Sequence, residues 1–114
     1  MHETVVAQNM VEAIAQEARK HEGRPVRAKI SCGELNAVND EVLTFAFDAI
    51  AQGTPCEGMT LQIEHKPMQA RCKQCAGTFP ITLSNTQCPD CQSDDFELLP
   101  DAPLVLEEIE FEKE

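Results

Sequence analysis

The chain has 114 residues, 42% of them hydrophobic, and a formal net charge of −11 from 20 acidic and 9 basic side chains. This length fits one compact domain, or a small domain with an insertion. The excess of carboxylates repels nucleic-acid phosphates and anionic lipid surfaces. Residues 1–25 lack the pattern of a signal peptide, and no apolar run approaches the ~18–20 residues of a membrane span. We therefore expect a cytoplasmic protein with no nucleic-acid and no membrane partner, whose cysteines are reduced thiols or metal ligands.

Residues 1–69 contain two helical and two strand-like patterns. Apolar side chains at three- and four-residue steps predict a helix over 4–21, and alternation predicts a strand over 26–32. Either Asn36 or Asn39 can cap a second helix, and alternation from Met59 predicts a second strand that ends by Pro67. The expected apolar face of the second helix comprises Val42, Phe45, Ala46, Ala49 and Ile50.

Apolar periodicity disappears over 70–99, where Cys, Pro, Gly, Asp, Ser and Thr dominate. We expect a loop-rich insert there, without a sheet or core of its own. A third strand-like run follows over 104–112. The predicted fold class is α+β: two helices on one face of a three-stranded sheet, with an inserted loop-rich zinc-ribbon domain. The expected domains are a discontinuous α+β domain of residues 1–69 and 100–114, and an inserted zinc-binding domain of residues 70–99.

Two CxxC pairs lie inside the insert, and the four cysteines are Cys72, Cys75, Cys88 and Cys91. A CxxC turn directs two thiolates at one centre, and two such turns complete a tetrahedron with Zn–S bonds of ~2.3 Å. Four thiolates leave no open position for water, so we expect structural Zn(2+). Such an ion can contribute on the order of 10–16 kcal/mol to folding, which a segment with few apolar residues needs. Inert buried thiols, or a redox CxxC at a helix start, fit this polar segment poorly.

The chain begins Met1-His2-Glu3. A bulky second residue favours retention of the first methionine, so the α-amine, the His2 amide nitrogen and the His2 imidazole can close two fused chelate rings. Glu3 can add its carboxylate or its amide nitrogen. This nitrogen-rich set suits Ni(2+) or Cu(2+), although an ordinary exposed histidine explains His2 alone.

The other cysteines and histidines suit structural roles. Cys32 lies on the apolar face of the first strand and is expected in the core, whereas the role of Cys56, in a turn, stays open. His21 and His65 are expected to be exposed at a helix end and a strand end. We find no Ser/His/Asp or Cys/His arrangement and no Gly-rich phosphate loop, so an enzyme is not expected.

Together these features resemble the HypA/HybF family of hydrogenase maturation proteins, which are nickel metallochaperones. The resemblance rests on Met1-His2-Glu3, Gly33-Glu34-Leu35, Phe45-Ala46-Phe47-Asp48, Gly53-Thr54, Glu57-Gly58, the two CxxC pairs and Ile109-Glu110. It implies that Met1, His2 and Glu3 bind the transported Ni(2+) and that the four paired cysteines bind zinc. It implies delivery of nickel to the [NiFe]-hydrogenase large-subunit precursor, work with a HypB-type GTPase and, in some members, service to urease. A homodimer is compatible with it.

Three positions depart from the family pattern. Ala76 and Gln92 replace glycines that usually follow each CxxC pair and often take positive φ, and Asp101-Ala102-Pro103-Leu104 replaces a usual Gly-x-Glu-Leu element. A side chain at positive φ costs about 1 kcal/mol. The alternative function is a zinc-ribbon module for protein interaction or nucleic-acid binding, although acidic residues outnumber basic ones in the insert.

Overall fold

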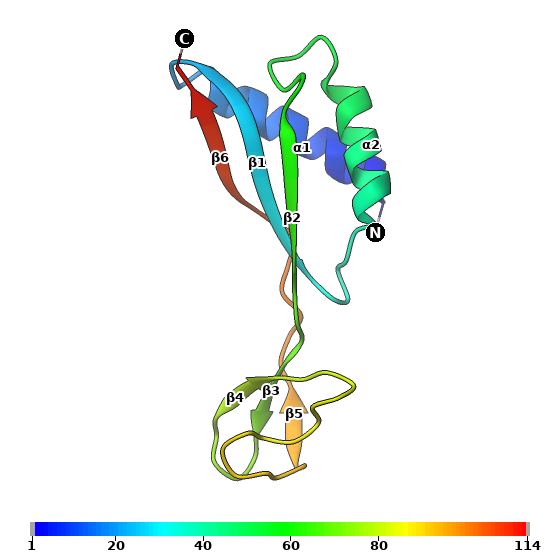
Figure 1. The fold of residues 1–114 in the computed structure, drawn as a ribbon, viewed down its shortest axis with the longest axis vertical. Coiled ribbons are helices and arrows are strands. Elements are labelled where there is room, and N and C mark those ends of the chain that lie inside the picture. Colours follow the sequence, from blue (N-terminus) through cyan, green and yellow to red (C-terminus); the bar gives the residue numbers. More distant parts are fainter. Residues whose placement is uncertain (1, 114) are drawn as a thin grey trace.

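A computed structural model describes residues 2–113 as an elongated molecule with two parts (Figure 1). Its principal extents are 54 × 26 × 18 Å. The elements in chain order are α1 (Glu3–Ala18), β1 (Arg24–Gly33), α2 (Asp40–Ala51), β2 (Thr60–Lys66), β3 (Gln69–Cys72), β4 (Thr78–Pro80), β5 (Phe96–Leu98) and β6 (Val105–Glu112). No helix within residues 2–113 is long and apolar enough to cross a membrane.

The larger part contains a sheet in the order β2-β1-β6. The central strand β1 pairs parallel with β2 and antiparallel with β6. Ala28, Ile30 and Cys32 are fully buried on its inner face, as the alternation predicts. On the outer face, Arg27 bonds to two glutamates of β6 and Lys29 pairs with Glu64 of β2. This division of the side chains confirms a half-buried strand.

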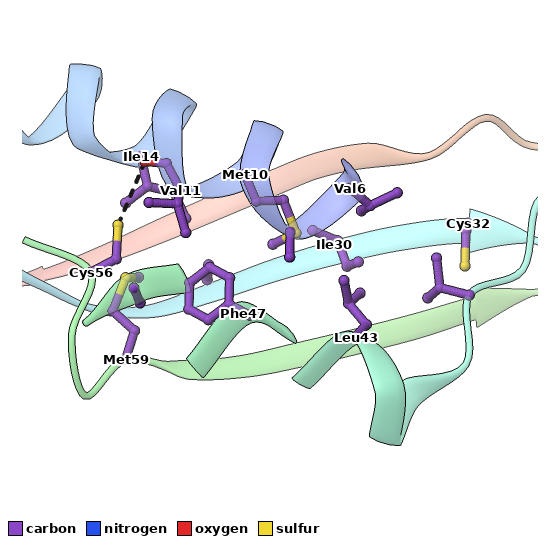
Figure 2. Packing of buried hydrophobic residues seen from close by; sticks show 14 residues of the cluster. Val6, Met10, Val11, Ile14, Ile30, Cys32, Leu43, Phe47, Cys56 and Met59 are labelled. Atoms are coloured by element: carbon purple, nitrogen blue, oxygen red, sulfur yellow. Dashed lines mark hydrogen bonds between the residues drawn. The ribbon is translucent and has the colours of Figure 1, made fainter. Parts of the chain in front are cut away.

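The core lies between the sheet and the two helices (Figure 2). From α1 it takes Met10, Val11 and Ile14, which face Leu43 and Phe47 of α2. The expected core role of Cys32 is confirmed, and Cys56 is buried in the same cluster. The Sγ of Cys56 lies 3.7 Å from the carbonyl oxygen of Val11, and burial raises the pKa of this thiol.

The predicted apolar face of α2 is wrong for three of its five residues. Val42, Phe45 and Ala49 are exposed, Ala46 and Ile50 are half-buried, and the fully covered stripe is Leu43, Phe47 and Ala51. The physical reason is that α2 is apolar around most of its circumference, so contact with α1 selects the buried stripe. Asn39, rather than Asn36, caps the helix, because its side chain accepts a hydrogen bond from the Val42 amide.

The smaller part corrects the expectation that the insert has no sheet or core. A second sheet has the order β4-β3-β5 with antiparallel pairing. Ala70, Cys72, Phe79 and Cys88 form its buried cluster. Phe96 packs edge-on against Phe79, with ring centroids 5.9 Å apart. The sequence concealed this sheet because its strands have only three or four residues, too few to display an alternation.

Two segments of the chain join the parts, one from β2 to β3 and one from β5 back to β6 (Figure 1). Asp101 anchors the second of these segments to the loop after β1. Its Oδ2 accepts hydrogen bonds from the Leu35 amide at 2.9 Å and from the Asn36 amide and side chain at 2.9 and 2.8 Å. A Cβ at Gly33 would collide with the Asp101 carboxylate. Gly33 therefore permits the close approach by which the return segment holds the loop after β1.

Candidate metal centres

The four paired cysteines converge at one end of the smaller sheet. Their Sγ atoms all lie within 4.8 Å of one another. The Cys72–Cys91 and Cys75–Cys88 sulfur pairs are each 3.5 Å apart. The first cysteine of each pair is buried and the second is exposed, so the group lies at the surface with one side against the Phe79 cluster. Four sulfurs at this spacing match the tetrahedral donor set that binds a divalent, thiophilic ion.

Backbone amides orient the sulfurs. The amides of Gln74 and Cys75 donate to Cys72 Sγ at 3.4 and 3.5 Å, and these bonds, the Cys75 amide first, lower the pKa of Cys72 to about 6. The Ser93 amide lowers the pKa of Cys91, but the neighbouring Cys72, burial and the other two thiols outweigh it and raise the value to about 12. Four thiolates this close repel one another, so a bound cation is what allows all four to be ionised together.

Both turns have the positive φ that the family's pattern of glycines after each CxxC pair implies. Ala76 has φ of 62° and Gln92 has φ of 59°, and they are the only described residues other than glycine with positive φ. The Ala76 and Gln92 amides donate to the carbonyl oxygens of Cys72 and Cys88, at 3.0 and 2.8 Å. The left-handed residue closes each turn, and here it carries a Cβ that the conformation disfavours.

The amino-terminal candidate lies at the start of α1. Met1 lies outside the described residues, whereas His2 is exposed, occupies the N-cap position and makes no side-chain capping bond. The first helical bond runs from the Val6 amide to the His2 carbonyl oxygen at 3.1 Å. Amides that precede it in the first turn have no partner within the helix.

Glu3 joins the amino terminus to the start of α2. Its Oε2 accepts a hydrogen bond from the Asn39 amide at 3.0 Å. This bond and its own backbone amide lower the pKa of Glu3, so the carboxylate is ionised at neutral pH. Figure 1 shows the described amino-terminal end of the chain beside the first turn of α2. Nothing in the sequence predicted this meeting of two helix starts, because the two residues are 36 positions apart.

Asp40, in the first turn of α2, contacts His65, which the sequence predicts only to be exposed at the end of a strand. His65 Nε2 lies 2.6 Å from Asp40 Oδ1, and His65 Nδ1 lies 3.6 Å from Cys32 Sγ. His65 therefore fastens the first turn of α2 to the ends of β1 and β2. His21, in contrast, stacks on Phe111 at a centroid distance of 4.6 Å, at the far end of α1. The three histidines thus occupy different surroundings, and only His2 has no partner of this kind among the described residues.

Comparisons with known proteins match nearly the whole chain. The family model described as "Hydrogenase/urease nickel incorporation, metallochaperone, hypA" matches residues 1–111. A hydrogenase maturation factor HypA from Desulfitobacterium hafniense is 36% identical over 114 residues, covering 99% of this chain and all of that protein. A hydrogenase maturation factor HybF from Salmonella typhimurium is 34% identical over 113 residues, covering 98% of this chain and all of that protein.

Two solved structures share the fold. The solution structure of the Ni metallochaperone HypA from Helicobacter pylori has a TM-score of 0.64 at 23% identity and covers both chains fully. A second HypA solution structure has a TM-score of 0.70 at 23% identity, covering 100% of this chain and 98% of the other. Together with the four-cysteine cluster and the extent of the family match, these findings mean that the chain belongs to the HypA family of nickel-incorporation metallochaperones for hydrogenase maturation.

Proposed function

We propose that this metallochaperone binds Ni(2+) at its amino terminus through Met1, His2 and Glu3, and holds structural Zn(2+) at Cys72, Cys75, Cys88 and Cys91. The observation that carries the proposal is the separation of two unlike donor sets on one chain. One set is four sulfurs within 4.8 Å; the other begins with an exposed His2 at the start of α1. The first suits a closed zinc site, and the second offers nitrogen and oxygen donors to nickel.

The zinc ion has a structural task in this proposal. The cluster around Phe79 contains few buried side chains, so apolar burial alone gives the smaller sheet little stability. A zinc ion bound by four thiolates fastens the two CxxC turns to each other and leaves no position for a water or a substrate. We assign residues 70–99 to this zinc-binding domain, and residues 1–69 and 100–114 to the discontinuous α+β domain, although β3 of the smaller sheet begins one residue before this boundary, at Gln69.

The local structure of α1 supports a nickel chelate at its start. A nickel ion that binds an amide nitrogen displaces that amide's proton. At the first turn this breaks no helical hydrogen bond, since the first such bond is donated by Val6. The positive end of the helix dipole disfavours a cation there. The ionised Glu3 and the carboxylates of Asp40 and Glu41 in the adjoining first turn of α2 offset that effect.

Nickel transport requires a donor and an acceptor of the metal. We propose that the chain works in the cytoplasm with a HypB-type GTPase and delivers nickel to the [NiFe]-hydrogenase large-subunit precursor. The relatives from Desulfitobacterium hafniense and Salmonella typhimurium are hydrogenase maturation factors, and this supports the assignment. A homodimer stays a prediction.

Titration of the zinc-loaded, untagged protein with Ni(2+) tests the amino-terminal site. One residue placed ahead of Met1 keeps every side chain but converts the α-amine into a peptide nitrogen, so we expect a loss of tight binding. His2→Ala removes the imidazole and should do the same. His21→Ala is the matched control, because His21 stacks on Phe111 at the other end of α1. Equal affinity of the extended and native proteins would show that the amine is not a ligand.

A further inference from the structure

A cavity of about 480 Å³ lies where the end of α1, the turn before β1 and the end of β6 meet. Its apolar lining includes Ala15, Ala18, Pro25 and Pro55, and its charged lining is Arg19, Arg24, Lys113 and Glu22. Three exposed cations and one exposed carboxylate therefore line this cavity, which is open to solvent, in a chain whose formal net charge is −11. The 16 residues of α1 separate it from the amino-terminal site by roughly 24 Å of helix.

The ion pairing of the chain makes this concentration of positive charge unusual. Seven of the nine lysines and arginines form an ion pair with a carboxylate. Arg19 and Arg24 are the two with no carboxylate within 4 Å among residues 2–113, and both line the cavity. Lys113 has only a 4.0 Å contact with Glu22, between side chains that are 82% and 89% exposed. Both arginines that have no carboxylate within 4 Å among residues 2–113 therefore lie at this one place.

The backbone holds these cations at one rim. Gly23 has φ of 94°, and a Cβ there would collide with the carbonyl oxygen of Glu112. The turn before β1 can therefore pass against the end of β6, where Arg24 is in register with Glu112, the residue that precedes Lys113. Arg19 also stabilises the negative end of the α1 dipole. That role does not apply to Arg24, which starts a strand.

We propose that this cavity is a binding site for a small polyanion that carries carboxylate or phosphate groups. A guanidinium presents paired N–H donors that match the oxygens of either group, and two of them face this cavity without a partner among residues 2–113. The volume is within the range of small-molecule pockets, about 300–1,000 Å³. The apolar lining suits a carbon skeleton between the charged groups. The site is separate from both metal centres and does not depend on the nickel assignment.

Amide NMR on the ¹⁵N-labelled, zinc-loaded protein tests the proposal with two probes. Tricarballylate represents carboxylates, because it lacks the hydroxyl with which citrate chelates metals, and pyrophosphate represents phosphates. Sodium chloride at matched ionic strength is the blank. We expect saturable shifts confined to residues 15–25, the neighbours of Pro55 and Lys113, and the probe that binds more tightly identifies the anion class.

Three variants decide the outcome. Arg19→Gln combined with Arg24→Gln should weaken binding at least about tenfold, and Lys113→Gln, at an exposed position, should weaken it less while leaving the fold intact. Arg71→Gln is the matched control, because it removes an arginine that already pairs with Glu97 in the smaller sheet, and it should change nothing. No saturable shift up to about 10 mM of either probe, shifts spread over all basic residues, or unchanged affinity in the double variant would overturn the site.

Discussion

The positive φ of Gln92 in the cysteine cluster predicts that glycine substitutions at two glutamines change zinc affinity in opposite directions. Gln92 and Gln74 are both exposed, and each belongs to a CxxC turn. Gln92 has φ of 59°, whereas Gln74 is not among the residues with positive φ. We expect Gln92→Gly to tighten zinc binding and Gln74→Gly to weaken it.

The magnitude follows from two effects of glycine. Left-handed backbone costs a side chain about 1–2 kcal/mol, and Gln92→Gly removes this cost. Glycine also widens the unfolded ensemble, which costs about 0.4–1 kcal/mol at either position. The net gain at Gln92 is about 0.5–1 kcal/mol, which is about two- to fivefold in zinc affinity, because binding and folding of the smaller sheet are coupled. Gln74→Gly has only the second effect and should lose about two- to fivefold.

Competition with a chromophoric chelator measures the zinc affinity of each variant at one pH. The Gln92 side chain donates an exposed hydrogen bond, 3.4 Å long, from its Nε2 to the Pro89 carbonyl oxygen, and its removal by glycine costs little at that length and exposure. Ala76→Gly should repeat the gain, and the double variant should show both gains if the turns act independently. Weaker zinc binding by Gln92→Gly, or equal losses at positions 74 and 92, would refute the strain argument.

Three further predictions test the two parts of the molecule. Nickel affinity should fall as pH drops from about 8 to about 6, because imidazoles and α-amines generally take up protons in this range. The Glu3 carboxylate stays ionised throughout the range, because its pKa is lowered. A loss of nickel affinity only below pH 5 would therefore contradict the nitrogen ligands. Phe47→Ala should lower the free energy of unfolding by about 3–5 kcal/mol. Phe45 lies two residues away on the same helix but is 77% exposed, so Phe45→Ala should change this free energy by less than about 0.5 kcal/mol. Thermal unfolding of the two variants measures the difference. Cys88→Ser should abolish zinc retention and the dispersed amide signals of the smaller sheet while α1, α2 and β1 keep theirs, and collapse of all signals together would show that the parts do not fold separately.

Local patterns allowed the α+β fold class and the cysteine cluster to be predicted. The alternation in β1 spans enough residues to define an inner and an outer face, and its outer cations find glutamates on β2 and β6. The CxxC spacing brings the two sulfurs of each pair together within one turn. Only the approach of the two turns to each other depends on the tertiary fold. The family pattern of glycines after each pair similarly predicted where positive φ would occur, and Ala76 and Gln92 have it.

Sequence patterns did not predict which residues are buried where tertiary contacts determine the buried face. Eight of the twelve residues of α2 are apolar, so more than one stripe could have faced the sheet. Packing against Met10, Val11 and Ile14 of α1 selected Phe47 and left Phe45 exposed. In the insert, Phe79 and Phe96 build a small core from strands of three residues each. A periodicity argument has nothing to measure in segments that short.

The two proposed binding sites at the ends of α1 also depend on tertiary contacts that the sequence does not predict. A chelate within Met1-His2-Glu3 can be predicted because its donors are consecutive. Its surroundings cannot, since Glu3 meets Asn39 only after both helices pack on the sheet. At the other end, Arg19 and Arg24 are separated in sequence from Lys113 by most of the chain, and no motif joins them. What unites them is that α1 ends, β1 begins and β6 ends at one corner of the fold. A charge count identifies an acidic protein, but only the fold brings Arg19, Arg24 and Lys113 to one corner, where we propose that an anion binds.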